Sequence, residues 1–537
     1  MKAALHDFYS HIAKKKRYWI PVLFFAIIAY AFSITNRTLG IDDMATEVYW
    51  GSGRAMIAAT RWGMALWVHL FSTPVFTPFL KKFLAVCLLI CGASAMACIA
   101  HFLLKRRNVW TYTIFASVLV TYPLIHEIYE YDGANMVVCG NFLLAAIAIL
   151  YQITHQGRPW KGILVSALPL TVIISSYESG IFVYISAVCL YLFCKYAVRR
   201  DDGTNWRWLR EGIRFAIPLV LALALRIVIG FALIKLYGLE YAPNGDTSIR
   251  WLSGSMRRTL RFLIKDLIVS YGINALVYFP LCIFLIAAAL FMIGALVRSA
   301  RQRRVLPLIL GGLVLASLFL QAIIQGSAMP YRTAQTLYLF VAFAAAAGIE
   351  LGLGTKTRGI RLISLILGLS LCLHQGVYLH RMLALNNQRS DNEIAIVHQL
   401  GYRLKSEFED KPVVFAGIYD MGNWISPQVE VDTSTPGGKL YQKIWEALNS
   451  GQTFESGRFI QNTVTSGLNW AANTYLPHQT MLGKCFSYCG YDIQVWDIYV
   501  HSDMKEYEQI AREEGMRPFE IRDMGDYILV CLGELPT

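Results

Sequence analysis

The chain has 537 residues, of which 55% are hydrophobic and only 16% are charged, and its mean hydropathy is +0.44. These values exclude a soluble globular protein and are typical of a polytopic membrane protein with one additional extramembrane domain. The formal net charge of +13 does not indicate a nucleic-acid partner, because Lys and Arg lie mostly in short loops between apolar segments, where they set membrane orientation.

Apolar segments near the length of about 20 residues that crosses a bilayer recur through the first two-thirds of the chain. We predict an α-helical polytopic membrane fold with about eleven transmembrane helices. The segments cover residues 18–35, 83–104, 109–125, 135–154, 161–177, 179–197, 213–236, 269–297, 305–325, 333–351 and 360–379.

The loops between these segments alternate in charge. A basic run at 14–17 precedes the first segment, and every second loop after it is also basic. The remaining loops carry acidic and aromatic residues, with the exception of a basic stretch at 250–265 whose pattern predicts an amphipathic helix on the membrane surface. By the positive-inside rule, the N-terminus is cytoplasmic, and an odd number of crossings puts the C-terminal part outside the cytoplasm.

The first outer loop, residues 36–82, carries the most informative pair in the sequence, Asp42 and Asp43. Two adjacent carboxylates beside a bilayer are costly, which indicates a function. A structural interpretation is also open, because Asp43 suits the N-cap of a helix expected over residues 44–60, with Asp42 as its solvated neighbour.

Further candidate residues lie in the predicted outer loops, chiefly 36–82, 126–134 and 237–268. They are Arg54, Arg61 and Trp62 in the first loop, Glu127, Glu130 and Asp132 in the second, Tyr177 and Glu178 in a short turn, and Arg332 at the outer end of an apolar segment. A carboxylate can accept the proton of an attacking hydroxyl group, and an arginine can bind a phosphate with two hydrogen bonds. Arg332 is equally well explained as an interfacial residue whose charged end reaches water.

No nucleotide-binding motif is present. The sequence contains neither a GxxxxGK[ST] motif nor a dinucleotide-binding fingerprint after a strand, and the predicted cytoplasmic loops lack a DxD-type sequence. An enzyme on the outer face of a membrane has no nucleotide sugars, so it would have to use a lipid-linked sugar.

The chain divides into a transmembrane part, residues 1–380, and a C-terminal part, residues 381–537. From about Asp391 the composition becomes that of a soluble α/β domain. Its predicted elements are a helix at 393–408, a strand at 412–417, a helix at 504–514 and a strand at 527–532. We therefore predict an extracytoplasmic α/β domain after the last membrane helix.

The three cysteines of the C-terminal part allow two disulfides, Cys485–Cys489 or Cys489–Cys531, and their connectivity cannot be read from the sequence. They offer too few ligands for a structural zinc site. The other eight cysteines lie within apolar segments, where a cysteine usually behaves as a small hydrophobic residue.

The stretch Asn-Arg-Thr-Leu-Gly-Ile-Asp-Asp at 36–43, followed by Gly53-Arg54 and Arg61-Trp62-Gly63, resembles the bacterial type II O-antigen glucosyltransferase family. These proteins belong to the GT-C class of polytopic glycosyltransferases. The resemblance implies a polyprenyl-phosphate-glucose donor, an active site on the outer face of the bacterial inner membrane, and a surface glycan such as the O-antigen of lipopolysaccharide as acceptor. It also implies companion proteins that make the lipid-linked glucose and flip it across the membrane.

On this resemblance, the first-loop acids of the family map to Asp42 and Asp43. The leading hypothesis is an inverting transfer of glucose or a similar hexose by direct displacement. We favour Asp43 as the general base and Asp42 as the group that orients the acceptor, with Arg332 bound to the phosphate. The pair could also bind a divalent cation, Mg²⁺ or Mn²⁺, although nothing in the sequence requires one.

Two alternatives stay open, and the first of them belongs to another functional class. A flippase or transporter of lipid-linked saccharides should show paired halves and polar or broken helices near the bilayer midplane, and the sequence shows neither. An O-antigen-type polysaccharide polymerase would share the hydropathy pattern and the arginines of the outer loops. Its sugar would arrive on a lipid diphosphate, so the identity of the donor distinguishes it from the leading hypothesis.

Overall fold

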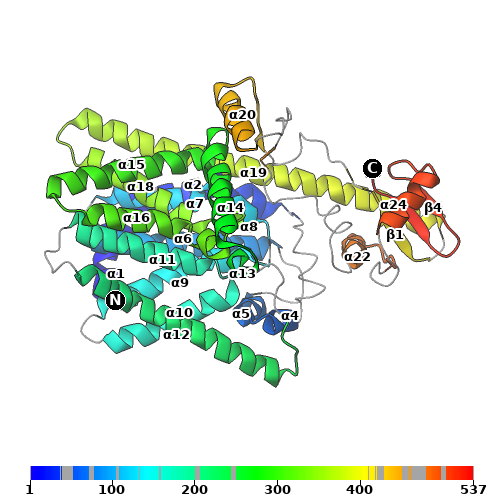
Figure 1. Cartoon of the computed structure of the whole chain (residues 1–537), viewed down its shortest axis with the longest axis horizontal. Coiled ribbons are helices and arrows are strands. Elements are labelled where there is room, and N and C mark those ends of the chain that lie inside the picture. The colour runs from blue at the N-terminus through cyan, green and yellow to red at the C-terminus, as the bar shows by residue number, and fades with distance from the viewer. Residues whose placement is uncertain are drawn as a thin grey trace.

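A bundle of long helices makes up most of the molecule, and one of these helices extends from it toward a smaller part with a β-sheet (Figure 1). The computed structural model describes residues 2–36, 38, 53–71, 78–104, 108–131, 133–155, 159–199, 206–242, 249–408, 411–417, 419, 429–449, 459–460, 479–496 and 504–535.

Within this described part of the chain, ten helices are long and apolar enough to cross a membrane. They are α2 (Lys16–Thr35), α6 (Pro78–Leu104), α7 (Val109–Thr121) continued by η3 (Pro123–Ile125) and α8 (His126–Tyr129), α9 (Asn135–Thr154), α10 (Pro159–Ser176), α11 (Gly180–Leu192) continued by η4 (Phe193–Val198), α12 (Arg207–Leu236), α15 (Phe279–Gln302), α18 (Gln335–Leu353) and α19 (Arg358–Glu407). The prediction of a polytopic α-helical protein is therefore confirmed.

Two of the predicted segments differ in detail. The segment 305–325 forms two shorter helices, α16 (Leu306–Leu318) and α17 (Leu320–Gln325), so it is not among the ten long helices. The segment 269–297 starts late, because η5 (Ile268–Ile273) and η6 (Asn274–Leu276) precede α15. Pro280 lies in the first turn of α15, where its missing N–H group costs no hydrogen bond.

Helix α7 lies inside the bundle, where it packs against α2, α6, α18 and α19. All but one of its residues are buried, which is typical of a helix that is apolar on every side. In contrast, α12 and α15 leave large apolar side chains such as Val220 and Leu290 exposed at the surface of the bundle. Lipid would cover these side chains in a membrane.

The predicted surface helix at 250–265 forms two pieces, α13 (Arg250–Ser253) and α14 (Met256–Leu267). The break falls at Ser255, whose hydroxyl oxygen accepts a hydrogen bond from the backbone N–H of Arg258 and caps α14. The apolar side chains of Met256 and Phe262 on α14 are exposed, and the basic side chains of this helix are exposed as well. Basic and apolar residues therefore lie together on the molecular surface.

Helix α19 joins the bundle to the C-terminal part without a break. It contains the predicted span 360–379 and the predicted helix 393–408, and no proline interrupts it. The division proposed at residue 380 thus falls inside a continuous helix. Figure 1 shows α19 running out of the bundle toward the sheet.

The sheet contains three strands in the order β1 (Val413–Ala416), β5 (Ile528–Cys531) and β4 (Ile521–Asp523), with β1 and β5 parallel. Helix α22 (Gln479–Tyr488) contributes to the apolar cluster on one face, and α24 (Met504–Glu513) contributes to a second cluster on the other. The predicted helices and strands of this region agree with the observed ones.

The cysteines of this region lie on both sides of the sheet. Cys485 and Cys489 belong to the cluster with α22, whereas Cys531 belongs to the cluster with α24 and donates a hydrogen bond to the carbonyl oxygen of Gly533 (3.2 Å). Among the described residues, which include all the cysteines, no two sulfur atoms are bonded to each other. In this structure the sheet lies between the side chains of Cys489 and Cys531.

Helix α20 (Pro436–Leu448), which follows β2 (Val429–Glu430) and precedes β3 (Phe459–Ile460), packs on the bundle rather than on the three-stranded sheet. The hydroxyl group of Tyr441 donates a hydrogen bond to Asn274 Oδ1 in η6 (3.2 Å). Trp445 is buried in the same apolar core as the membrane helices. The C-terminal region therefore contacts the bundle at η6 as well as through α19.

Candidate active site

The described candidate residues from four separate loops lie at one end of the bundle. These loops contribute α4 (Arg54–Ala58) and α5 (Trp62–Phe71), then α8, the turn between α10 and α11, and η7 (Tyr331–Thr333). Hydrogen bonds and ion pairs connect the elements of these four loops. Three candidates, Asp42, Asp43 and Asp132, lie outside the described residues.

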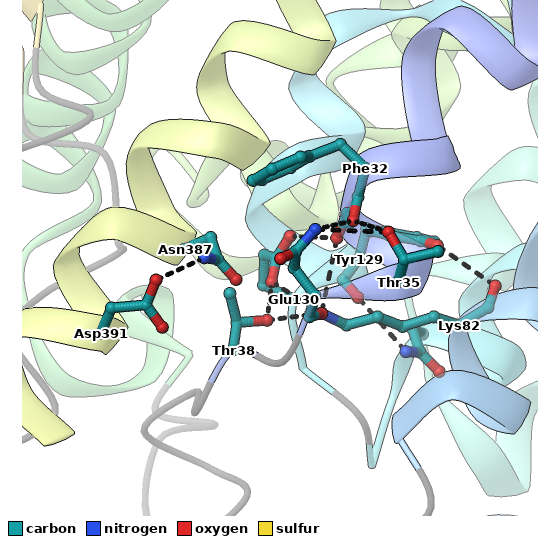
Figure 2. Close-up of polar contacts among 11 residues, drawn as sticks. Phe32, Thr35, Thr38, Lys82, Tyr129, Glu130, Asn387 and Asp391 are labelled. Carbon is teal, nitrogen blue, oxygen red and sulfur yellow. Dashed lines mark hydrogen bonds and ion pairs between the residues drawn. The ribbon is translucent and has the colours of Figure 1, made fainter.

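Glu130, directly after α8, lies in a buried polar cluster (Figure 2). The Ser33 hydroxyl donates to Glu130 Oε1 (3.0 Å), and Lys82 Nζ forms an ion pair with Oε2 (3.3 Å). The hydroxyl of Thr38 donates to the same Oε2 atom. Lys82 is fully buried, so this charge has been removed from water and depends on these partners.

The Glu130 cluster fixes the beginning of the first loop. Lys82 Nζ also donates to the backbone oxygen of Asn36 (3.4 Å), and Thr38 hydrogen-bonds to both charged groups. Thr38 precedes Asp42 by four positions in the chain. The acid pair therefore follows closely after a residue that a buried ion pair holds in place.

Glu127, one helical turn before Glu130, is buried and accepts a hydrogen bond from the backbone N–H of Arg332 (2.9 Å). The guanidinium carbon of Arg332 lies 5.9 Å from the centre of the Tyr131 ring. The second outer loop thus contacts the segment that precedes α18 through both the backbone and the side chain of Arg332.

Tyr331 connects the same segment to η5 and η6 through hydrogen bonds. Its hydroxyl donates to the backbone oxygen of Ser270 (2.7 Å) and accepts from Asn274 Nδ2 (2.9 Å). Burial raises the pKa of Tyr331 well above its ordinary value, so its hydroxyl stays protonated and acts as a fixed donor. The elements η5 and η6 therefore share a hydrogen-bond network with the residue next to Arg332.

Glu178, in the turn between α10 and α11, pairs with two arginines. Its Oε2 atom lies 2.9 Å from an Nη atom of Arg61, and its Oε1 atom lies 2.8 Å from an Nη atom of Arg226. The Glu178 side chain is 33% exposed, unlike that of Glu130. Water therefore screens this cluster more strongly than the buried one.

The Arg61-Trp62-Gly63 motif fits against the same turn. Trp62 Nε1 donates to the backbone oxygen of Arg226 (3.4 Å), beside the guanidinium that binds Glu178. A Cβ atom at Gly63 would lie 2.3 Å from Ser175 Oγ, so only glycine allows α5 to approach α10 this closely. Each residue of the motif thus has a separate structural role.

A hydrogen bond connects the Glu178 turn to α18. Gln335 Nε2 donates to Ser179 Oγ (2.7 Å), and both residues are buried. Gln335 follows Arg332 by three positions, so the arginine–carboxylate cluster and the Glu127 contact are parts of one connected region.

Two predicted residues lie at the edge of this region. An Nη atom of Arg54 donates to the backbone oxygen of Tyr237 (3.4 Å), which joins α4 to the end of α12. Tyr177 is half-buried and packs against the apolar core. The proposed binding roles of Arg54 and Tyr177 stay predictions.

Three residues that were not predicted also belong to the site: Ser33, Lys82 and Arg226. A signal was available for Arg226, because a charge in the middle of an apolar helix needs a partner or a function. Lys82 opens an apolar segment and was interpreted only as its flank. Its pairing with Glu130 joins two residues separated by 48 positions, which no local pattern reveals.

Two solved structures of ArnT from Cupriavidus metallidurans are distantly similar to the chain, at 13% sequence identity. The apo structure has a TM-score of 0.39 and covers 74% of this chain and 81% of ArnT. The structure bound to undecaprenyl phosphate has a TM-score of 0.36, with coverages of 76% and 83%. No curated protein matches the chain.

A family model described as "Glucosyl transferase GtrII" matches residues 31–346. This range is more than half of the chain and includes every candidate site residue from Asp42 to Arg332. The resemblance seen in the first outer loop is therefore confirmed. The chain is a multi-pass membrane glycosyltransferase and belongs to the glucosyl transferase GtrII family.

Proposed function

We propose that this glycosyltransferase moves glucose, or a similar hexose, from a polyprenyl phosphate to a cell-surface polysaccharide such as O-antigen. The reaction takes place on the outer face of a bacterial inner membrane, with the N-terminus cytoplasmic and the C-terminal part periplasmic. The observation that carries this proposal is the family match, together with the meeting of the described outer-loop acids and arginines at one end of the bundle.

The chemistry is a direct displacement. The oxygen of the acceptor hydroxyl attacks the anomeric carbon of the sugar on the face opposite the phosphate. The bond between that carbon and the phosphate oxygen breaks, and its electron pair stays on the phosphate. The hydroxyl proton passes to Asp43, while Asp42 orients the acceptor. Because phosphate is already a good leaving group, no general acid is needed. The single attack from the opposite face inverts the configuration at the anomeric carbon.

The leaving phosphate gains negative charge and needs a cationic partner, for which we propose Arg332. Two contacts support this choice. Glu127 accepts a hydrogen bond from the backbone N–H of Arg332, which fixes the position of that residue. The guanidinium carbon of Arg332 lies 5.9 Å from the centre of the Tyr131 ring, which orients the cationic group.

The described carboxylates are proposed to position other groups rather than to accept the proton. Glu130 is surrounded by Lys82 and two hydroxyl donors, so its lone pairs are already engaged. Glu178 is engaged by two guanidinium groups. A general base needs a lone pair that can reach the acceptor hydroxyl, which favours the first-loop pair over Glu130 and Glu178.

The proposed donor implies companion activities. A synthase must make the lipid-linked glucose on the cytoplasmic face, and a flippase must bring it to the outer face. The divalent cation considered between Asp42 and Asp43, Mg²⁺ or Mn²⁺, stays a prediction, and no step above depends on it.

The test replaces Asp42 and Asp43 singly with Asn and measures transfer of labelled glucose from polyprenyl phosphate to the glycan. Removing a general base should lower the rate by about 10²-fold or more. Glu240→Gln is the matched control, because Glu240 is an exposed acid of the third outer loop with no assigned role. It should transfer glucose at the wild-type rate, and all variants should reach wild-type protein levels in the membrane.

Full transfer by both Asn variants would contradict the role of the pair as base and favour its interpretation as a helix cap. If the wild-type protein transfers nothing from this donor, the donor assignment is wrong. A lipid-diphosphate-linked repeat unit should then be tested as the substrate.

A further inference from the structure

A second cluster of polar side chains lies far from the candidate active site. Asp7 in α1 (Lys2–Phe8), His11 in η1 (Tyr9–Ala13) and His101 in the last turn of α6 come together there. Lys82, in the first turns of α6, is 19 positions from His101, or roughly 28 Å along the helix at 1.5 Å per residue. The cluster therefore lies near the opposite end of the bundle, where Figure 1 shows α1.

The three side chains converge on a small volume. Asp7 Oδ2 lies 3.0 Å from His101 Nε2, and Asp7 Oδ1 lies 3.1 Å from His11 Nδ1. One possible ligand atom from each residue can be chosen so that all three lie within 4.8 Å of one another. Ligand atoms at about 2.0–2.2 Å around a tetrahedral zinc ion are about 3.3 Å apart, and each imidazole nitrogen lies close to this distance from one of the two Asp7 oxygens.

His101 is prepared as a ligand by its surroundings. It is 3% exposed, and its ring makes edge contacts with Phe8 (5.8 Å) and Tyr112 (5.2 Å) that fix its orientation. Its Nε2 atom points at Asp7, while its Nδ1 atom is buried and makes no hydrogen bond within the described part of the chain. Nε2 is therefore the ring nitrogen of His101 that is placed to be the ligand atom.

Asp7 supplies a negative charge to the cluster, and the exposure of Asp7 and His11 lets an ion enter it from solution. Asp7 is the only acidic residue before Asp42, although the segment around it is basic. The Asp7 side chain is 57% exposed and that of His11 35% exposed, so an ion can reach the cluster from solution. Without an ion, His11 Nδ1 has other contacts, with the backbone oxygen of Asp7 (3.0 Å) and with Ser10 Oγ (3.2 Å).

We propose that Asp7, His11 and His101 bind one divalent transition-metal ion, with Zn²⁺ as the best match. Two imidazole nitrogens and one carboxylate oxygen are a donor set that zinc accepts in tetrahedral sites, with water as a fourth ligand. The ion ties α1 and η1 to the end of α6. Its distance from Lys82 separates it from the sugar-transfer chemistry.

The test uses the full-length protein, purified in detergent without a polyhistidine tag. Zn²⁺ is titrated in competition with a chelating dye, and the melting temperature is measured with and without Zn²⁺. The wild-type protein should bind one Zn²⁺ per chain and melt at a higher temperature when it is bound. His101→Ala and Asp7→Asn should each weaken binding by at least about 10- to 100-fold, the loss seen even for outer-shell partners of metal ligands.

His6→Ala is the matched control, because His6 is an exposed histidine on the same short helix and lies outside the cluster. It should bind Zn²⁺ as tightly as the wild-type protein. If His101→Ala fails to fold, His11→Gln carries the test, since His11 lies near the surface and should show the same loss. Absence of stoichiometric binding by the wild-type protein, or equal binding by the His6 and His11 variants, would overturn the proposal.

Discussion

Glu130 and Glu178 are carboxylates at the same end of the bundle, each paired with a basic residue from a distant part of the chain, yet their surroundings differ. Glu130 is 2% exposed and faces Lys82 together with the hydroxyls of Ser33 and Thr38. Glu178 is one-third exposed and faces two guanidinium groups, with water able to reach all three charges.

The difference shows how burial changes what an ion pair does. In the Glu130 cluster, both charges have lost their hydration, so each one depends on its remaining partners and cannot be removed alone without a large cost. The cluster therefore holds Ser33, Asn36 and Thr38 in place. In the Glu178 cluster, water screens the charges, so the pairing orients Arg61 and Arg226 without holding the fold together.

The largest expected effect comes from breaking the buried pair. Lys82→Met leaves the Glu130 carboxylate buried without its countercharge, and Glu130→Gln does the same to the ammonium group of Lys82. We expect each substitution to lower the free energy of unfolding by about 3–5 kcal/mol. Thermal or denaturant unfolding of the purified protein measures this loss. The amount of each variant in the membrane is a second measurement.

The double variant Lys82→Met, Glu130→Leu separates charge burial from packing. Because apolar replacement of a whole buried pair is often neutral, we expect the double variant to be more stable than Lys82→Met alone. Glucose transfer should stay low, since Thr38 has lost both of its polar partners near the acid pair. A double variant as unstable as the single one would show that packing, not charge, dominates at this position.

Much of the bundle could be predicted from sequence because hydropathy and loop charge are local properties. The predicted span 135–154 agrees with α9 at both ends. The partners of the acids could not be predicted in the same way. Arg61 and Glu178 are separated by 117 positions, and their pairing depends on how α5 packs against α10.

In the C-terminal region, too, local features were predicted and a long-range feature was not. The strands at 413–416 and 528–531 were predicted from short β-branched and apolar runs, which are local signals. That α19 continues through residue 380 was missed, because a change in composition was interpreted as a change in structure. A polar sequence can continue a helix when no proline or capping residue ends it.

The second prediction concerns the packing that delivers Arg61 to Glu178. Gly63→Ala places a Cβ atom 2.3 Å from Ser175 Oγ and 2.4 Å from Ser176 Oγ, so α5 must move away from α10. We expect a loss of about 1–3 kcal/mol in unfolding free energy, the usual cost of overpacking, together with reduced transfer. Unfolding and transfer assays on the same preparation measure both effects.

Gly348→Ala is the control for this prediction, because a Cβ atom at Gly348 in α18 meets nothing within 4 Å. It should be neutral or slightly stabilising, since alanine favours a helix more than glycine does. Adding Ser175→Ala and Ser176→Ala to Gly63→Ala removes the two hydroxyl oxygens and should restore part of the loss. No recovery would indicate that backbone contacts, such as the one with the Ser175 carbonyl carbon at 3.0 Å, set the limit.

The smallest expected effect on stability comes from Glu178→Gln, which removes the charge but keeps the size of the side chain. Because the cluster is one-third exposed, we expect a loss of at most about 1 kcal/mol, well below that for Glu130→Gln. Salt provides the sharper test of the comparison. Raising the ionic strength should shrink the difference between wild type and Glu178→Gln, because salt screens charges that water reaches, and should leave the effect of Glu130→Gln unchanged. Equal salt dependence of the two variants would mean that burial does not distinguish the two clusters.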